Sequence, residues 1–210
     1  MPDELSSRIE NVMAILGPLH PNHKPLLDYE NPFQLLVATV LAAQCTDAGV
    51  NMVTPALFSR FPTPAALADA PLAELERIVH STGFFRAKAH NIKALSAQLR
   101  DRYNGAIPQT MEELTALPGV GRKTAGVVLS TFFNTPAIIV DTHFARVTLR
   151  LGFTHSDKPI VIERDIAAIA PADQWTRISH VLNQHGRDTC HARKRECEVC
   201  PVRSLCPSVG

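Results

Sequence analysis

The chain has 210 residues, 45% of them hydrophobic and 20% charged, and its formal net charge is +1. These values are ordinary for a globular protein with a sizeable core, and the near-neutral total indicates no particular class of partner. The longest apolar run, LLVATVLAA, is far too short to span a bilayer, which excludes a membrane-spanning helix. The N-terminal stretch MPDELSSRIE is acidic and amphipathic, unlike a signal or transit peptide, so we expect a cytoplasmic protein of prokaryotic type with no targeting segment.

Helix signals begin near the N-terminus and recur along the first half of the chain. Apolar side chains at helical spacing predict a helix over residues 3–17. Asn31-Pro32 and Thr63-Pro64 each place an N-capping residue before a proline, which predicts a helix beginning at each proline. Between them, Cys45 lies in an apolar helical segment and is predicted to be a small core residue.

The middle of the chain continues the helical pattern. Asn104-Gly105 ends a basic helix over residues 86–103, and Thr110 opens a short helix after it. Strand signals are few, and only PAIIV, residues 136–140, is predicted to be extended.

Two further helices are predicted in the last third, near residues 160–170 and around residues 175–185. The helix over residues 3–17 has no obvious partner in the middle of the chain. We therefore predict an all-α fold with two helical lobes, in which the N-terminal helix joins the C-terminal part. The cleft between two lobes is a common place for a binding site.

A glycine-containing turn separates two helical segments in LPGVGRKTAGVVL, residues 117–129. Gly119 and Gly121 flank Val120, and both glycines can adopt positive φ and leave no Cβ in the way. Backbone N–H groups in such a turn bind anions at the start of a helix, so residues 119–121 are predicted to bind a DNA phosphate as a helix-hairpin-helix. A plain αα-hairpin with a glycine cap is the alternative. Lys123 lies at the mouth of the second helix, where the helix dipole disfavours a cation.

The C-terminal segment contains four cysteines in the pattern C-x6-C-x2-C-x5-C, namely Cys190, Cys197, Cys200 and Cys206. Structural zinc usually has two close pairs of ligands, whereas only one pair is close here. The pattern favours four thiolates around an iron–sulfur cluster, with zinc as the alternative. Arg193, Lys194 and Arg195 lie between the first two cysteines, and a loop tied at both ends is predicted to present these cations to phosphates.

The segments LPGVGRKTA, VDTHFARV and HGRDTC, together with the cysteine pattern, resemble the endonuclease III family, helix-hairpin-helix DNA glycosylases and AP lyases with a [4Fe–4S] cluster. AAQCTD and STGFFRAKA resemble further family segments, so the resemblance runs over nearly the whole chain. It implies a six-helix barrel domain over residues 25–135, with the helix-hairpin-helix at about 112–130. It also implies an iron–sulfur domain made of residues 1–24 and 136–210, with DNA bound in the cleft.

The resemblance implies excision of oxidised pyrimidines from duplex DNA through a lysine Schiff base, followed by cleavage of the abasic site by β-elimination. Lys123 matches the family's catalytic lysine and Asp141 its catalytic aspartate. A lysine nucleophile must be neutral, and a helix N-terminus with partial burial favours the neutral amine. Asp141 would help to deprotonate Lys123 and stabilise positive charge on the sugar, and capping of the next helix is its alternative role. The expected partner is damaged duplex DNA, bound in the nucleoid by a monomer.

Three further residues are assigned to DNA binding by the resemblance. A target base must leave the stack before an enzyme reaches it. Gln44 matches the residue that fills the vacated gap, and Phe84 matches an apolar wedge in the opposite strand. His143 is placed in the pocket. The alternatives are a polar helix end for Gln44, a core position for Phe84 and a structural role for His143.

The chain departs from the family pattern at three positions. Gly126 stands where the family usually has asparagine, Ala42 where it has serine and Arg195 where it has proline. The first two bear on the level of activity and the range of bases, and the third is expected to make the cysteine loop more basic and looser. The alternative functions are a DNA-binding or redox-sensing paralogue with little catalysis and a monofunctional glycosylase of the same superfamily. Lys123 argues against the monofunctional glycosylase, because those relatives lack the lysine.

Overall fold

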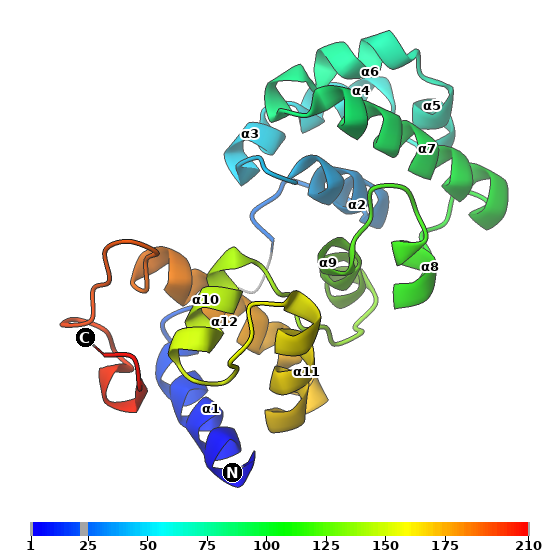
Figure 1. Cartoon of the computed structure of the whole chain (residues 1–210). Coiled ribbons are helices and arrows are strands. Elements are labelled where there is room, and N and C mark those ends of the chain that lie inside the picture. The colour runs from blue at the N-terminus through cyan, green and yellow to red at the C-terminus, as the bar shows by residue number, and fades with distance from the viewer. Residues whose placement is uncertain (1, 22–24, 210) are drawn as a thin grey trace. The chain divides into compact units, whose positions relative to one another are not determined.

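The computed structural model describes residues 2–21 and 25–209, and these residues form helices joined by turns (Figure 1). No strand occurs among them, and their only bridge pairs Cys190 with Arg195. The prediction of an all-α fold is confirmed. None of the described helices is long and apolar enough to cross a bilayer.

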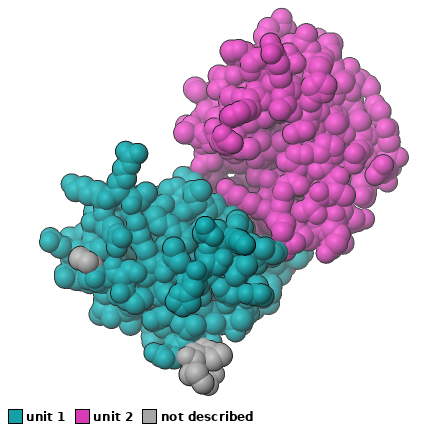
Figure 2. Space-filling model, viewed as in Figure 1, with its two compact units in different colours: residues 1–24, 135–210 teal, residues 25–134 magenta. Residues whose placement is uncertain are grey.

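The chain divides into two compact units, shown separately coloured in Figure 2. One unit comprises residues 1–24 and 135–210, and the other comprises residues 25–134. The N-terminal helix therefore belongs to the same unit as the C-terminal third of the chain, because its apolar face is buried there.

The unit over residues 25–134 is built from eight α-helices and one 3-10 turn. They are α2 (Pro32–Leu41), α3 (Asp47–Asn51), α4 (Thr54–Arg60), α5 (Pro64–Asp69), α6 (Leu72–Ile78), η1 (His80–Thr82), α7 (Phe85–Tyr103), α8 (Met111–Thr115) and α9 (Arg122–Phe132). The long helix α7 packs against α5 and α6, while α2 contacts α7 and α9. Helix α2 is the most buried, since nearly every one of its side chains is apolar. It therefore forms the centre of this unit.

Capping side chains fix where several of these helices begin. The Asn31 side chain accepts a hydrogen bond from the N–H of Gln34 at 3.0 Å. The Thr63 hydroxyl accepts from the N–H of Ala66 at 3.2 Å, and the Thr110 hydroxyl accepts from Glu113 at 3.2 Å. These bonds satisfy N–H groups that a helix leaves without an internal partner. The predicted helix starts at Pro32, at Pro64 and after Thr110 are confirmed.

The other unit contains α1 (Pro2–Leu16), α10 (Thr142–Arg150), α11 (Pro159–Ile169), η2 (Ala172–Gln174), α12 (Trp175–Asp188) and η3 (Arg203–Leu205). Helices α10 and α12 pack closely against each other, and α1 contacts α11 and α12. Phe144 and Val147 of α10 lie in the same buried cluster as Val12 of α1 and Ile166 of α11. This core holds α10 and α12 rigidly, and both helices carry residues of the candidate site.

The segment predicted to be extended, residues 136–140, lies outside any helix and forms no strand, and two of its N–H groups bond to side chains of α12. The N–H of Ile139 donates to the Ser179 hydroxyl at 2.9 Å, and that of Ala137 donates to the Thr176 hydroxyl at 3.2 Å. Cys45 lies in the turn after α2 and is only half-buried, so it is not a core residue of a helix.

Candidate functional site

The glycine turn lies between α8 and α9, as the sequence predicts. Gly119 has φ +77°, whereas Gly121 has an extended backbone with φ −93°, so only Gly119 adopts the positive φ that glycine allows. Val120 is buried, and its N–H donates to the carbonyl of Leu117 at 3.1 Å. A Cβ added at Gly121 would meet no atom of the described chain within 4 Å. The start of α9 is therefore open to an incoming group, and helix N-termini favour anions.

Gly119 is pressed against the side chain of Asn91 on α7. A Cβ added at Gly119 would lie 2.9 Å from Cβ and Nδ2 of Asn91, closer than real Cβ contacts allow. The positive φ and this contact both require glycine here. Helix α7 thus supports the turn from behind through Asn91.

Replacing Gly119 with alanine is expected to lower the free energy of unfolding by about 2 kcal/mol, from backbone strain and from the clash with Asn91. Gly121→Ala is the matched control, since its backbone is extended and its Cβ would meet open space. Chemical denaturation of both variants tests this. Equal stability losses in the two variants would contradict the role given to Asn91.

Lys123 is the second residue of α9, directly after the turn. Its side chain is exposed, so the expected partial burial is wrong in the protein without DNA. Arg122, the first residue of the helix, is also exposed. The amine of Lys123 is therefore accessible to a large substrate.

Asp141 lies in the unit of residues 1–24 and 135–210 and is the N-cap of α10. Its Oδ1 accepts hydrogen bonds from the N–H groups of His143 and Phe144, at 3.0 and 2.8 Å. Its Oδ2 accepts a hydrogen bond from Nδ2 of Asn183 on α12, whose Oδ1 in turn accepts from Nε of Arg187 at 3.0 Å. The capping role is confirmed, and both oxygens of the carboxylate are held in place.

His143 is held by a structural contact. Its Nδ1 lies 3.2 Å from Nη2 of Arg146, and the same guanidinium donates to the carbonyls of Gly186 and Cys190, at 2.7 and 3.0 Å. The ring is half-buried beside α12. These contacts support the structural alternative for His143.

Gln44 and Phe84 are exposed residues of the unit over residues 25–134, and both have a left-handed backbone. Gln44, in the turn after α2, has φ +53°, and Phe84, just before α7, has φ +48°. Left-handed backbone in residues other than glycine is costly and collects at functional positions. The Phe84 side chain is 68% exposed, which rules out the core alternative.

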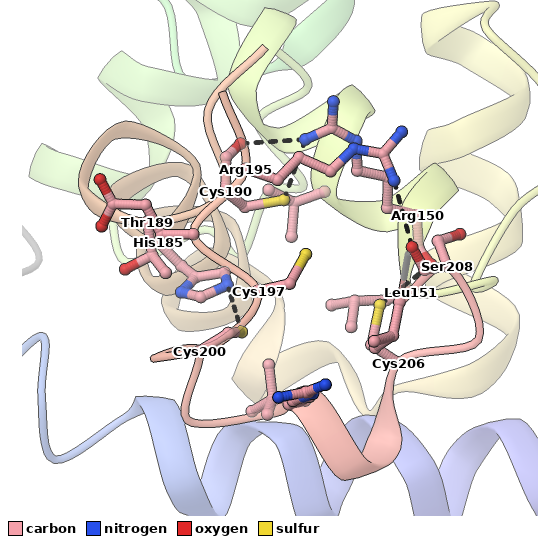
Figure 3. A pocket seen from close by; sticks show the side chains of 15 residues that line it. Arg150, Leu151, His185, Thr189, Cys190, Arg195, Cys197, Cys200, Cys206 and Ser208 are labelled. Atoms are coloured by element: carbon pink, nitrogen blue, oxygen red, sulfur yellow. Dashed lines mark hydrogen bonds between the residues drawn. The ribbon is translucent and has the colours of Figure 1, made fainter. Parts of the chain in front are cut away.

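The four C-terminal cysteines line one cavity in their unit (Figure 3). Burial raises the pKa of the Cys200 thiol, the N–H of Val202 lowers it in part, and the charges of the other three cysteines raise it further. The other three cysteines thus lie near enough to Cys200 for their charges to act on its thiol. A positively charged group in the cavity would favour the thiolate of Cys200.

Among residues 2–21 and 25–209, no three His, Cys, Asp or Glu side chains lie together as ligands of a single metal ion.

Arg150 of α10 ties the start of the cysteine loop to the helical core. Its Nη1 donates to the carbonyl of His191 at 2.7 Å and to Sγ of Cys190 at 3.2 Å, and its Nη2 donates to the carbonyl of Ala192 at 3.1 Å. Hydrogen bonds to a ligand sulfur are one means by which a protein tunes a metal centre. Sequence reasoning missed Arg150, although it lies just after the segment VDTHFARV and faces the loop.

His185 of α12 flanks the same cavity. Its Nε2 lies 3.8 Å from Sγ of Cys200. Burial lowers the pKa of His185 to about 4, with a further decrease from His20 that Asp188 opposes. The imidazole is therefore neutral at neutral pH.

The three basic residues of the cysteine loop differ in their contacts. Arg193 and Lys194 are exposed, as expected for residues that bind phosphates. Arg195 instead donates from Nη1 to the carbonyl of Ser208 at 3.1 Å. Arg195 therefore joins the loop to the C-terminal residues. Of the other departures, Gly126 is buried in α9 and Ala42 caps α2.

Comparison with known proteins places this arrangement in a family. Residues 37–172 match the model of the HhH-GPD superfamily base excision DNA repair proteins. Endonuclease III of Synechocystis is 48% identical over 202 residues, which cover 96% of this chain and 92% of that protein. Endonuclease III of Bacillus subtilis is 42% identical over 200 residues, or 95% and 91% of the two chains.

The chain belongs to the endonuclease III family. A solved structure described as a trapped endonuclease III–DNA covalent intermediate superposes with a TM-score of 0.92 at 43% identity, covering 97% of this chain and 96% of that one. A non-covalent endonuclease III–DNA complex gives the same TM-score at 44% identity, covering 97% and 95%. A thermostable thymine-DNA glycosylase has a TM-score of 0.85 at 20% identity, which shows a shared fold alone.

Proposed function

We propose that this endonuclease III family member excises oxidised pyrimidines from duplex DNA and cleaves the resulting abasic site, with Lys123 as nucleophile. The observation that carries the proposal is the position of Lys123 at the second residue of α9, exposed and directly after the glycine turn. The relative solved as a covalent intermediate with DNA supports a nucleophile in the protein. We further propose that the protein acts on nucleoid DNA in the cytoplasm.

The proposed reaction runs through an imine. The Nζ of Lys123 attacks C1′ of the deoxyribose, and the C1′–N bond to the base breaks, with the base leaving as it gains a proton. Opening of the sugar ring gives a protonated imine. Loss of a proton from C2′ then forms the C2′–C3′ double bond as the 3′ phosphate leaves with the electrons of the C3′–O bond. Water finally hydrolyses the imine and frees Lys123.

Asp141 is proposed to stabilise the positive charge that develops on the sugar and to accept a proton from Lys123. A carboxylate suits both roles, and the bonds from His143, Phe144 and Asn183 fix its orientation before substrate binds. The role requires only that the bound DNA brings the sugar to both residues.

The phosphate contacts are proposed to come from the backbone of residues 119–121 and from Arg193 and Lys194. Gln44 and Phe84 are proposed to enter the duplex at the site of the extruded base. The exposure of both side chains and their left-handed backbone support this role.

Cys190, Cys197, Cys200 and Cys206 are proposed to hold a [4Fe–4S] cluster. Their shared cavity and the hydrogen bond from Arg150 to Cys190 support this assignment. When bound, the cluster supplies a cationic iron core that binds the four thiolates and orders the loop carrying Arg193 and Lys194.

The proposed function is tested with duplexes that carry one thymine glycol or one abasic site. Wild-type protein is expected to do more than bind these duplexes. It releases the base, nicks the DNA and gives a covalent adduct when borohydride reduces the imine. Binding with salt-dependent affinity but without release, nicking or adduct would identify a DNA-binding paralogue instead.

Asp141→Asn separates capping from catalysis. Asparagine caps helices as well as aspartate, so Oδ1 keeps the bonds to His143 and Phe144, while one bond to Asn183 is put at risk, at a cost of about 1 kcal/mol. Excision of thymine glycol is expected to fall by about 10²-fold or more, because the negative charge is lost. Single-turnover kinetics and thermal unfolding of the variant measure the two effects. Full activity would reduce Asp141 to a helix cap.

A further inference from the structure

Lys88 of α7 is a buried lysine with one specific partner. Its side chain is 5% exposed, and its Nζ donates a hydrogen bond to the carbonyl of Thr82 at 2.7 Å. Burial lowers the pKa of Lys88, and the nearby Cys45 thiol opposes this decrease. A buried ammonium is unfavourable unless bonded, and an apolar side chain of the same length would fill the space without that cost. The bond from Lys88 to Thr82 is therefore expected to do more than fill space.

The contact lies at one end of a short left-handed segment. Thr82 ends η1, and the next two residues, Gly83 and Phe84, have φ +70° and φ +48°. At the other end, the N–H of Lys88 donates to the carbonyl of Phe84 at 3.1 Å. Lys88 thus holds the segment on both sides, by its side chain before it and by its backbone after it. A left-handed phenylalanine persists only where its surroundings impose that backbone.

The second exposed turn lies close to the same lysine. Helix α3, which follows the Gln44 turn, contacts η1. Cys45, the neighbour of Gln44, is near enough for its charge to act on the Lys88 ammonium. The ammonium thus lies beneath η1, close to the Gln44 turn.

We infer that Lys88 is a positioning residue, whose bond to the Thr82 carbonyl fixes the backbone of Gly83 and Phe84 and so aims the exposed Phe84 ring at the DNA. This inference rests on the proposed entry of Phe84 into the duplex. Lys88 itself touches no substrate. Its effect on the reaction passes through Phe84 alone, so removal of the Phe84 ring is expected to remove that effect.

Lys88→Met keeps the length and the apolar stem of the side chain and removes the donor. Hydrogen exchange at the N–H groups of residues 83–85 is expected to become faster, and excision of thymine glycol under single-turnover conditions to slow about tenfold. A control comes from the same helix: Nζ of Lys93 donates to the carbonyls of Ala68 and Ala70, at 2.5 and 2.7 Å, away from the wedge. Lys93→Met is expected to lose stability but to excise at the wild-type rate.

A double-mutant cycle with Phe84→Ala decides whether the loss passes through the ring. In the Phe84→Ala background, Lys88→Met is expected to cause no further slowing. An equal loss in both backgrounds, or an equal loss in Lys93→Met, would show general destabilisation and overturn the inference.

A second measurement keeps this test separate from the proposed chemistry. Duplex DNA with 2-aminopurine opposite a tetrahydrofuran abasic analogue cannot form an imine, and its fluorescence reports disturbance of the opposite strand. At saturating protein, the change in fluorescence is expected to fall in Phe84→Ala and in Lys88→Met and to persist in Lys93→Met. An unchanged signal in Lys88→Met overturns the inference even if the wild type excises, and a lost signal supports it even if the wild type does not.

Discussion

Lys123→Gln is expected to abolish the borohydride adduct with abasic DNA and to slow release of thymine glycol by about 10³-fold or more. Glutamine keeps the polar character and most of the length of the side chain, but its amide nitrogen is not a nucleophile. Lys123 is exposed on the surface of α9, so its replacement leaves the core of the unit intact. The loss is therefore expected in catalysis and not in folding.

Arg122→Gln is the matched control for this substitution. Arg122 precedes Lys123, shares its helix end and is exposed in the same way. Loss of this positive charge beside the turn proposed to bind phosphate is expected to weaken binding to all sequences and to reduce the salt dependence by roughly one charge, with the adduct still forming. Adduct formation at full yield in Lys123→Gln would assign the nucleophile to another residue.

The helix boundaries were predictable where the chain carries its own local signals. Asn31 and Thr63 stand before prolines, and both side chains cap the helices that follow. Asn104 marks the end of α7, where it adopts a left-handed conformation. In each case the capping bond joins residues only a few positions apart, so the sequence alone contains both partners.

Contacts between distant segments were not predictable in this way. The bonds from Asn183 to Asp141 and from Arg150 to the cysteine loop join residues about 40 positions apart. The sequence predicts that residues 136–140 are extended, but it does not show that the N–H groups of Ala137 and Ile139 bond to hydroxyls of Thr176 and Ser179 on α12. Nothing in the local pattern of either segment indicates such a partner.

The local sequence pattern does not predict that Lys123 and Phe84 are exposed, although the family resemblance assigns both residues to the site. A lysine after a glycine turn and a phenylalanine before a helix fit a buried position as well as an exposed one. The left-handed backbone of Phe84 and its 68% exposure become visible only when η1 and α7 are packed together. The buried Lys88 that connects these two elements has no sequence signal at all, since lysines are seldom buried.

Cys200→Ser is expected to remove the visible absorption of the iron–sulfur cluster and to release the segment over residues 190–209. Among these residues only Val202 is buried, so apolar packing alone does not hold the segment in place. The loss of a structural metal centre is expected to cost about 4 kcal/mol of stability in this unit. Affinity for duplex DNA is expected to fall as well, because Arg193 and Lys194 lie in the released loop.

Cys45→Ser provides the control, because Cys45 belongs to the other unit and lies in the turn after α2. This variant is expected to keep the visible spectrum, the protection of residues 190–209 from proteolysis and the binding of DNA. A colourless wild-type protein that contains zinc would contradict the cluster. A coloured Cys200→Ser variant with a protected C-terminal segment would instead show that the other three cysteines and His185, which lies 3.8 Å from Cys200 Sγ, suffice to hold it.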